Sequence, residues 1–172
     1  VAAEPFSLIL RGEVSVTNAT TFANTGTLQL GGVESDNLYF AGGLVATAPS
    51  SISMAGVVHT NNADITLGQT GGSIELLEMT DINSGSGGLH VVSPVTAHAY
   101  RLRLLSTGPV ILDGDLSSAG ALSFVGPVTF TNSATLSAAS FDFANGVTFG
   151  GSTTITASSL TLGGPVNVAG DL

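Results

Sequence analysis

The sequence predicts an all-β fold, a parallel β-solenoid in which three short strands form one coil of about 19–24 residues and roughly eight coils stack into one domain spanning residues 1–172. Two observations predict this class. Short apolar segments recur at one shared spacing, and within each segment apolar and polar residues alternate as they do in strands. No apolar period of 3.6 continues over the length of a normal helix.

The most regular repeats occur in residues 101–172, where we expect 19-residue coils. The first strand family reads Gly-Pro-Val-Thr-Phe or a close variant, at positions 108–112, 126–130, 145–149 and 164–168. The second family occupies positions 121–124, 140–143 and 159–162, and the third occupies 134–138 and 153–157. Each member lies 18 or 19 positions after the one before it. Three families that share one period indicate three faces of one coil.

Alternation within these strands predicts which side chains face the core. Because successive residues of a strand point to opposite faces, residues two apart share the inside. The predicted core columns consist of Leu122, Phe124, Phe141, Phe143, Leu160, Leu162, Val128, Phe130, Val147, Phe149, Val166 and Val168. The corners between the strands carry Gly, Pro, Asn and Ser, residues that favour tight turns.

Residues 1–100 show the same alternation with looser spacing, so we expect irregular coils there. A path from Leu28 through Ile52 to Ile74 has steps of 24 and 22 positions. The Gly- and Ser-rich run 83–88 is predicted to be a flexible loop and a contact candidate. The uncommon run His98-Ala99-Tyr100-Arg101 follows it, so a lateral feature of the stack is expected in this part of the chain.

One segment carries a family resemblance. The run Asn24-Thr25-Gly26-Thr27-Leu28-Gln29-Leu30-Gly31-Gly32 resembles the autotransporter-associated β-strand repeat, and the rest of the chain is similar in texture to filamentous haemagglutinin-like exoproteins of bacteria. The resemblance implies a secreted, right-handed β-helix that acts in adhesion, aggregation or biofilm formation. It supplies no catalytic motif. The expected function is therefore a non-catalytic scaffold at the bacterial surface or outside the cell, with a cell-surface structure or a glycan as ligand.

Composition excludes several other classes. Only 9% of the residues are charged, there is no Lys, and the net charge is −9, which repels rather than neutralises a nucleic-acid backbone. There is no Cys, so thiolate metal sites and cysteine nucleophiles are excluded. No apolar run reaches the roughly 18 residues that a membrane helix requires. We expect neither a nucleic-acid partner nor a membrane span.

One alternative function is that of a polysaccharide-binding or polysaccharide-cleaving β-helix protein, because parallel β-helices include polysaccharide-cleaving enzymes. The chemistry needs two carboxylates that converge on one bond, or a basic group beside a metal-bound uronate. The candidate pairs are Asp113 with Asp115 and Glu75 with Glu78. Carboxylates of this kind are usually solvated charges at turns and strand edges, so we predict no catalytic residue.

The basic residues give no better site. Arg101 and Arg103 share one face by alternation and are expected to pair with acids of a neighbouring coil. The histidines show no metal-ligand spacing: His59, His90 and His98. We therefore predict no metal site and no cofactor.

Two further possibilities concern the surface and the ends. If Thr135 and Ser137 lie over Thr154 and Thr156, they form a small hydroxyl grid of the kind that an ice-binding solenoid displays. The final residues Gly170-Asp171-Leu172 repeat Gly114-Asp115-Leu116 and so fall in mid-coil. This predicts either a fragment of a longer chain or a homo-oligomer, such as a head-to-tail fibre, formed by coils that stack end to end.

Overall fold

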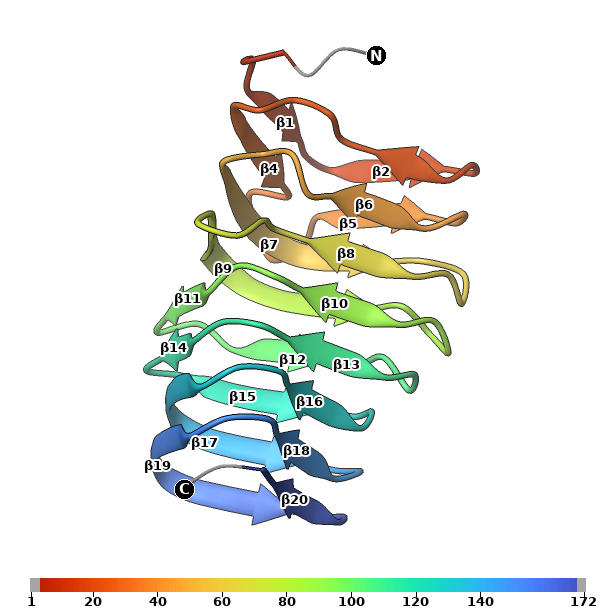
Figure 1. Ribbon diagram of the computed structural model, residues 1–172. Coiled ribbons are helices and arrows are strands. Elements are labelled where there is room, and N and C mark those ends of the chain that lie inside the picture. Colours follow the sequence, from red (N-terminus) through yellow and green to blue (C-terminus); the bar gives the residue numbers. More distant parts are fainter. Residues whose placement is uncertain (1–3, 170–172) are drawn as a thin grey trace.

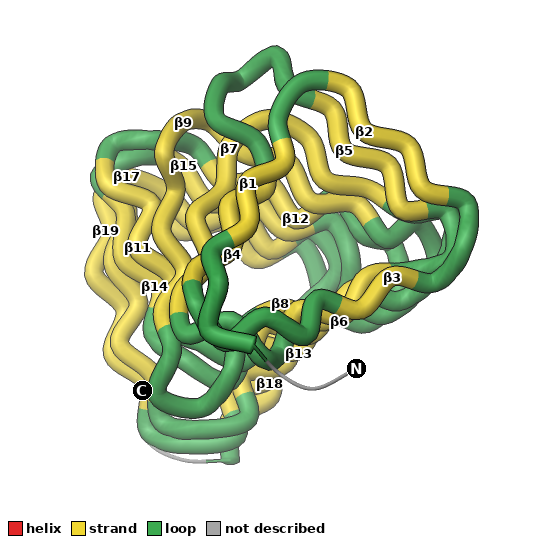
Figure 2. The backbone as a smooth tube through the Cα atoms, turned by 90° about the horizontal axis from the view of Figure 1, so that it is seen from above, coloured by secondary structure: helices red, strands yellow, loops and turns green. Residues whose placement is uncertain are grey.

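The computed structural model describes residues 4–169, which wind into a stack of eight coils built only of strands and their connecting turns (Figure 1). Every paired strand is parallel to its neighbour in the coil before or after it. Seen from the N-terminal end, the chain runs clockwise as it moves away from the viewer, so the coil is right-handed (Figure 2). The predicted class, an all-β parallel solenoid, is confirmed. Residues 4–169 contain no helix long and apolar enough to cross a membrane.

Each coil has three faces, which we number in the order in which the chain passes through them. Face 3 is a sheet of eight strands, one from each coil: β3 (Thr20–Thr21), β6 (Leu44–Ala46), β8 (Ile65–Leu67), β10 (Leu89–Val91), β13 (Val110–Leu112), β16 (Val128–Phe130), β18 (Val147–Phe149) and β20 (Val166–Val168). Partners in successive coils of this face are 24, 21, 24 and 21 positions apart from β3 to β13. From β13 to β20 the steps are 18, 19 and 19. The regular coils are therefore the later ones.

Faces 1 and 2 are hydrogen-bonded into one larger sheet that bends around a corner. Face 1 begins with β1 (Leu8–Leu10) and β4 (Thr27–Leu30) and includes β11 (Val95–His98) and β14 (Leu116–Ser118). Face 2 contains β2 (Glu13–Val16), β5 (Asn37–Phe40), β12 (Leu102–Leu104) and β15 (Ala121–Phe124). Four long strands run through both faces: β7 (Ser51–His59), β9 (Ser73–Asn83), β17 (Ala134–Phe143) and β19 (Thr153–Leu162). Half of the coils thus have two strands rather than three, because pairing continues around the corner.

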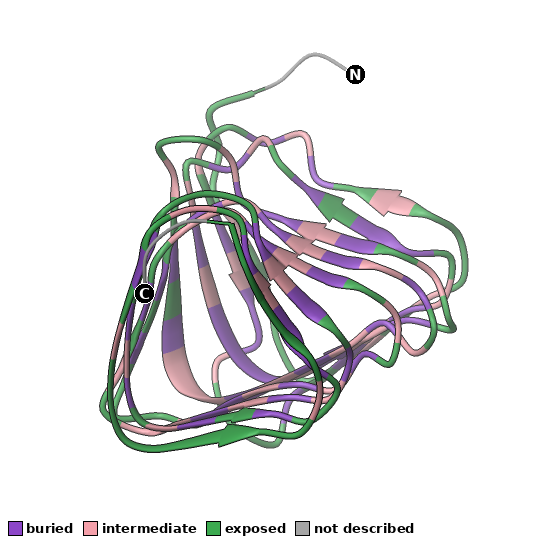
Figure 3. Cartoon of the chain, turned by 60° about the horizontal axis from the view of Figure 1, so that its bottom comes forward, coloured by how far each residue is buried: buried purple, intermediate pink, exposed green. Residues whose placement is uncertain are grey.

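The core is a continuous column of apolar side chains along the axis of the stack. Buried residues accordingly recur on the strands of successive coils (Figure 3). Phe124 stacks on Phe143 with ring centroids 4.8 Å apart, and Phe130 stacks on Phe149 at 5.5 Å. The register pairs Phe143 with Leu162 in the next coil. Residues 19 apart in the later coils therefore lie directly over one another.

The last described coil differs from the predicted core columns in one respect. Leu160, Leu162, Val166 and Val168 take their expected places in the register, yet 40–44% of each remains exposed. The reason is positional, because within residues 4–169 no further coil covers them. The triplet Gly170-Asp171-Leu172, which was expected in mid-coil, lies outside the described residues.

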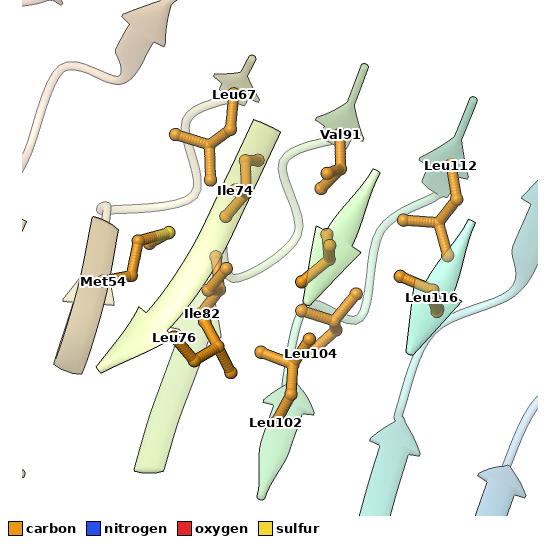
Figure 4. Close-up of a pocket in the computed structure, with 11 residues that line it drawn as sticks. Met54, Leu67, Ile74, Leu76, Ile82, Val91, Leu102, Leu104, Leu112 and Leu116 are labelled. Carbon is orange, nitrogen blue, oxygen red and sulfur yellow. The ribbon is translucent and has the colours of Figure 1, made fainter. Parts of the chain in front are cut away.

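The middle of the stack contains a small apolar void between β7, β9, β12 and their neighbours (Figure 4). Its lining is entirely aliphatic or Met: Met54, Leu67, Ile74, Leu76, Ile82, Val91, Val95, Leu102, Leu104, Leu112 and Leu116. Buried Phe side chains occur in the core before this region, at Phe22 and Phe40, and after it from Phe124 onward. The wider middle coils thus lack the large rings that fill the stack elsewhere. At about 10 Å³ the void is at the lower limit for one water molecule and has no polar partner for it.

The run 83–88, predicted to be a loop, forms the turn between β9 and β10 and is hydrogen-bonded to both adjacent coils. The hydroxyls of Ser84 and Ser106, both fully buried, lie 2.7 Å apart and join this corner to the next coil. Asn62 accepts a bond from the Ser86 backbone N–H, and Asp64 accepts one from Gly88. Side-chain bonds from both adjacent coils therefore hold the run in place.

Candidate functional site

The first carboxylate pair predicted from the sequence does not converge on one point. Asp113 and Asp115 lie at the corner between faces 3 and 1 and bind different groups. Asp113 Oδ2 is 2.7 Å from His90 Nε2, and its Oδ1 accepts a bond of 2.6 Å from the Thr131 hydroxyl. Asp115 Oδ1 accepts a bond of 2.7 Å from the backbone N–H of Thr135. Both carboxylates are thus occupied in tying coils together.

The second pair is separated in the same way. Glu75 lies on face 1, where its Oε1 is 2.7 Å from His98 Nε2 in the next coil. Glu78 lies further along β9, at the corner, and accepts a bond of 3.1 Å from the backbone N–H of Glu34. The two side chains bind partners in opposite directions along the stack, so they do not form a two-carboxylate site.

Arg101 and Arg103 both reach the same acid of the preceding coil, as expected. Arg103 lies opposite Asp81 in the register and binds its carboxylate with Nε (2.8 Å) and with Nη2. This bond raises the pKa of Arg103 above its ordinary value. Arg101 Nη2 is 3.8 Å from Asp81 Oδ1, too far for a hydrogen bond, and Arg101 Nε is buried with no partner.

The three histidines are dispersed over the stack, one on each face. His98 pairs with Glu75 on face 1 and His90 with Asp113 on face 3. His59 on face 2 stacks against Tyr39 with ring centroids 4.7 Å apart, and burial lowers its pKa. Among residues 4–169, no three His, Asp or Glu side chains lie close enough together to hold a metal ion.

These contacts share one arrangement that the sequence did not reveal. Each face carries one acid–base pair, and each pair joins two consecutive coils between β9 and β13: Glu75–His98, Asp81–Arg103 and His90–Asp113. The paired residues are 22 or 23 positions apart. We call these three pairs the charge belt. The 19-residue period of the later coils could not predict them, because the coils that they join are longer.

A recess that contains both polar and apolar side chains lies beside the charge belt on the side of the stack. It is lined by residues from four coils: Glu34, Gly56, Val57, Met79, Asp81, Arg101 and Arg103. Its volume is about 170 Å³, below the roughly 300–1,000 Å³ of pockets that enclose drug-sized ligands. Two carboxylates and two guanidinium groups line it, beside the half-buried apolar side chains of Val57 and Met79.

A bulge in β9 creates this recess. On β7, Met54 pairs with Leu76 and Gly56 pairs with Thr80, so the single residue Ala55 faces three residues of β9. These extra residues form a bulge at the corner between faces 1 and 2, where Glu78 and Met79 lie. Gly56 has φ +75°, and a Cβ there would lie 2.3 Å from the carbonyl oxygen of Asp36. Only glycine fits at this position, because the backbone carbonyls of Val33 and Asp36 in the preceding coil approach it closely.

The predicted hydroxyl grid lies on face 1, where the register pairs Thr135 with Thr154 and Ser137 with Thr156. One of its columns is longer than expected. Thr96 pairs with Ser117, and Ser117 with Ser137, so four hydroxyl residues follow one another over four coils.

No family model, no curated protein and no solved structure matches this chain.

Proposed function

We propose that this chain is a non-catalytic scaffold that acts in adhesion, or in fibre or biofilm formation, outside a bacterial cell or at its surface. The observation that carries the proposal is the use of the charged side chains. All three pairs of the charge belt tie one coil to the next, and the candidate carboxylates bind partners in their own stack instead of converging on a cleft. Such side chains stabilise a rod, and a rod with three flat faces presents a large surface for contact.

Two further observations support a mechanical role. Buried apolar side chains from Leu28 to Phe149 belong to one core cluster that runs through the coils, as expected for a rod that bears load along its axis. The exposed surface is rich in Ser, Thr and Asn and poor in charge, which suits repeated weak contacts with neutral polar surfaces. Fibre formation would use the strand edges of any coil that no further coil of the same chain covers.

A display experiment tests this proposal. The chain is displayed on a non-adherent bacterium, and attachment to saccharide-coated and protein-coated surfaces and cell aggregation are measured together with release of sugar from the polysaccharides. We expect increased attachment or aggregation with no sugar release. A display strain carrying Phe143→Asp, which places a charge in the core, is the matched control and should lose the effect. Cleavage of a polysaccharide, or attachment and aggregation equal to those of the control, would overturn the proposal.

Ice binding is a second candidate, favoured by the hydroxyl column Thr96, Ser117, Ser137 and Thr156 on face 1. A flat sheet repeats these hydroxyls at the strand spacing of about 4.8 Å. Thermal hysteresis of the purified chain tests it. A freezing point equal to that of a solution of Phe143→Asp would reject this candidate.

A further inference from the structure

We infer that the recess lined by Glu34, Val57, Met79 and Arg101 binds one neutral sugar unit of a glycan. This inference rests on the proposed adhesive function and names its ligand and its site.

The guanidinium of Arg101 is not fully hydrogen-bonded within the chain. Its Nε is buried and has no hydrogen-bond partner, and its Nη2 lies 3.8 Å from the nearest oxygen of Asp81. Asp81 is already engaged by two nitrogens of Arg103. The Arg101 side chain as a whole is 41% exposed, so guanidinium donors that Asp81 does not bind are available to an acceptor in the recess.

The charges around the recess favour a neutral acceptor over an anion. Arg101 alone would suit an anion as well as a neutral oxygen. However, Glu34 also lines the recess, Glu78 lies at the same corner, and the chain has a net charge of −9. Its field opposes the approach of an anionic polymer. A neutral hydroxyl avoids this repulsion, because it accepts from Arg101 and can donate to Glu34.

The walls and the size of the recess match a single sugar ring. Val57 and Met79 give the recess an apolar wall beside these polar groups. A pyranose ring has the same two-sided chemistry, with hydroxyls around its edge and an apolar C–H face. The volume of about 170 Å³ and the open position at the corner between faces 1 and 2 suit one sugar of a longer chain rather than an enclosed small molecule.

The test compares intact wild-type chain with Arg101→Gln in binding to immobilised gluco-, manno- and galacto-oligosaccharides, with oligogalacturonates as the anionic arm. Arg101→Gln removes the guanidinium and its charge and leaves the Asp81–Arg103 pair in place. We expect wild type to bind at least one neutral series, and the variant to bind it about tenfold more weakly or worse. Arg11→Gln is the matched control, because Arg11 does not line the recess and its bond to Gln29 is long at 3.3 Å; it should bind as wild type does. Thermal melting of each variant establishes that it is folded.

Three results would overturn the inference: equal binding by wild type and Arg101→Gln, binding of oligogalacturonates alone, and no binding to any of these saccharides. Failure of the proposed function is distinguishable from these. A displayed chain that attaches to surfaces equally well with and without Arg101→Gln leaves the scaffold proposal standing and removes the sugar site, whereas a chain that neither attaches nor aggregates removes the scaffold itself.

Discussion

Truncation of Phe143 should destabilise the stack far more than truncation of Leu162, although both residues belong to one core column. Phe143 is fully buried and packs against three rings: Phe124 (4.8 Å), Phe141 (5.9 Å) and Phe130 (6.3 Å). Phe→Ala in a core costs about 3–5 kcal/mol, and we expect the upper half of that range because several ring contacts are lost together. Leu162 is 44% exposed, so its truncation loses only part of the roughly 1.5–3 kcal/mol of a fully buried side chain, or about 1 kcal/mol.

Urea unfolding followed by far-UV circular dichroism measures both free energies, and thermal melting gives a second reading. For a chain of this size the two losses correspond to a Tm decrease of roughly 8–20 °C for Phe143→Ala and about 2–4 °C for Leu162→Ala. Equal losses would refute the reasoning, because they would show that position along the stack does not decide how deeply this column is buried.

Three other predictions follow from particular contacts. Asp81→Asn should lower the free energy of unfolding by about 1 kcal/mol, since the ion pair with Arg103 is partly exposed. A double-mutant cycle with Arg103→Gln should give a coupling energy of about the same size, and additive losses would contradict the pairing. Burial lowers the pKa of His59 below 6.5, so protonation of this side chain favours the unfolded state. Wild type should therefore lose stability relative to His59→Gln as the pH falls below about 6.5. Stability curves that stay parallel for the two chains between pH 7.5 and 5 would reject this prediction. Val91→Ile adds one methylene beside the void and should stabilise the fold by up to about 0.8 kcal/mol. Val147→Ile, in a coil filled by Phe rings, should destabilise it by about 1–3 kcal/mol. If Val147→Ile melted at a higher temperature than Val91→Ile, there would be no unfilled space beside Val91.

The sequence predicted register best where coil length is constant. The period of the later coils correctly placed Phe124, Phe143 and Leu162 over one another, and the longer steps from Leu28 to Ile52 to Ile74 also match the observed pairs. Alternating apolar residues of one strand must all face the core, and a shift by one residue would expose every one of them. Pattern alone therefore fixes the register once two strands are known to be neighbours.

The candidate site was less predictable because it depends on departures from that pattern. The recess exists because Leu77, Glu78 and Met79 form a bulge opposite Ala55, and nothing in the alternation of β9 marks where the extra residues leave the sheet. The pairing of Arg101 and Arg103 with an acid was expected, but the particular acid, Asp81, is set by a local coil length that only the fold reveals. The signal that could have been used is local: this is where two of the three arginines occur in a chain with little charge.

The joining of strands around the corner between faces 1 and 2 was also missed. In β17 and β19 the bend passes through Ala138 and Ala157, which pair across coils like any strand residues. Short side chains allow a bend without the Gly or Pro that usually marks a turn, so the sequence contains no turn signal at this corner. The exposure of Leu160 and Leu162 has a different origin, since burial depends on the next coil rather than on the residue itself.

The stacking of whole coils, on which the proposed scaffold depends, is tested most directly by deletion. Removing the segment 128–146, one full coil, joins Pro127 to Val147 and places Val147 over Val110, so that the register is kept. Removing only the segment 128–137, half a coil, shifts every later strand out of its column. Circular dichroism and urea unfolding should show a folded, cooperative β-structure for the full-coil deletion and loss of cooperative unfolding in the later coils for the half-coil deletion. Two deletions that unfold alike would contradict the account.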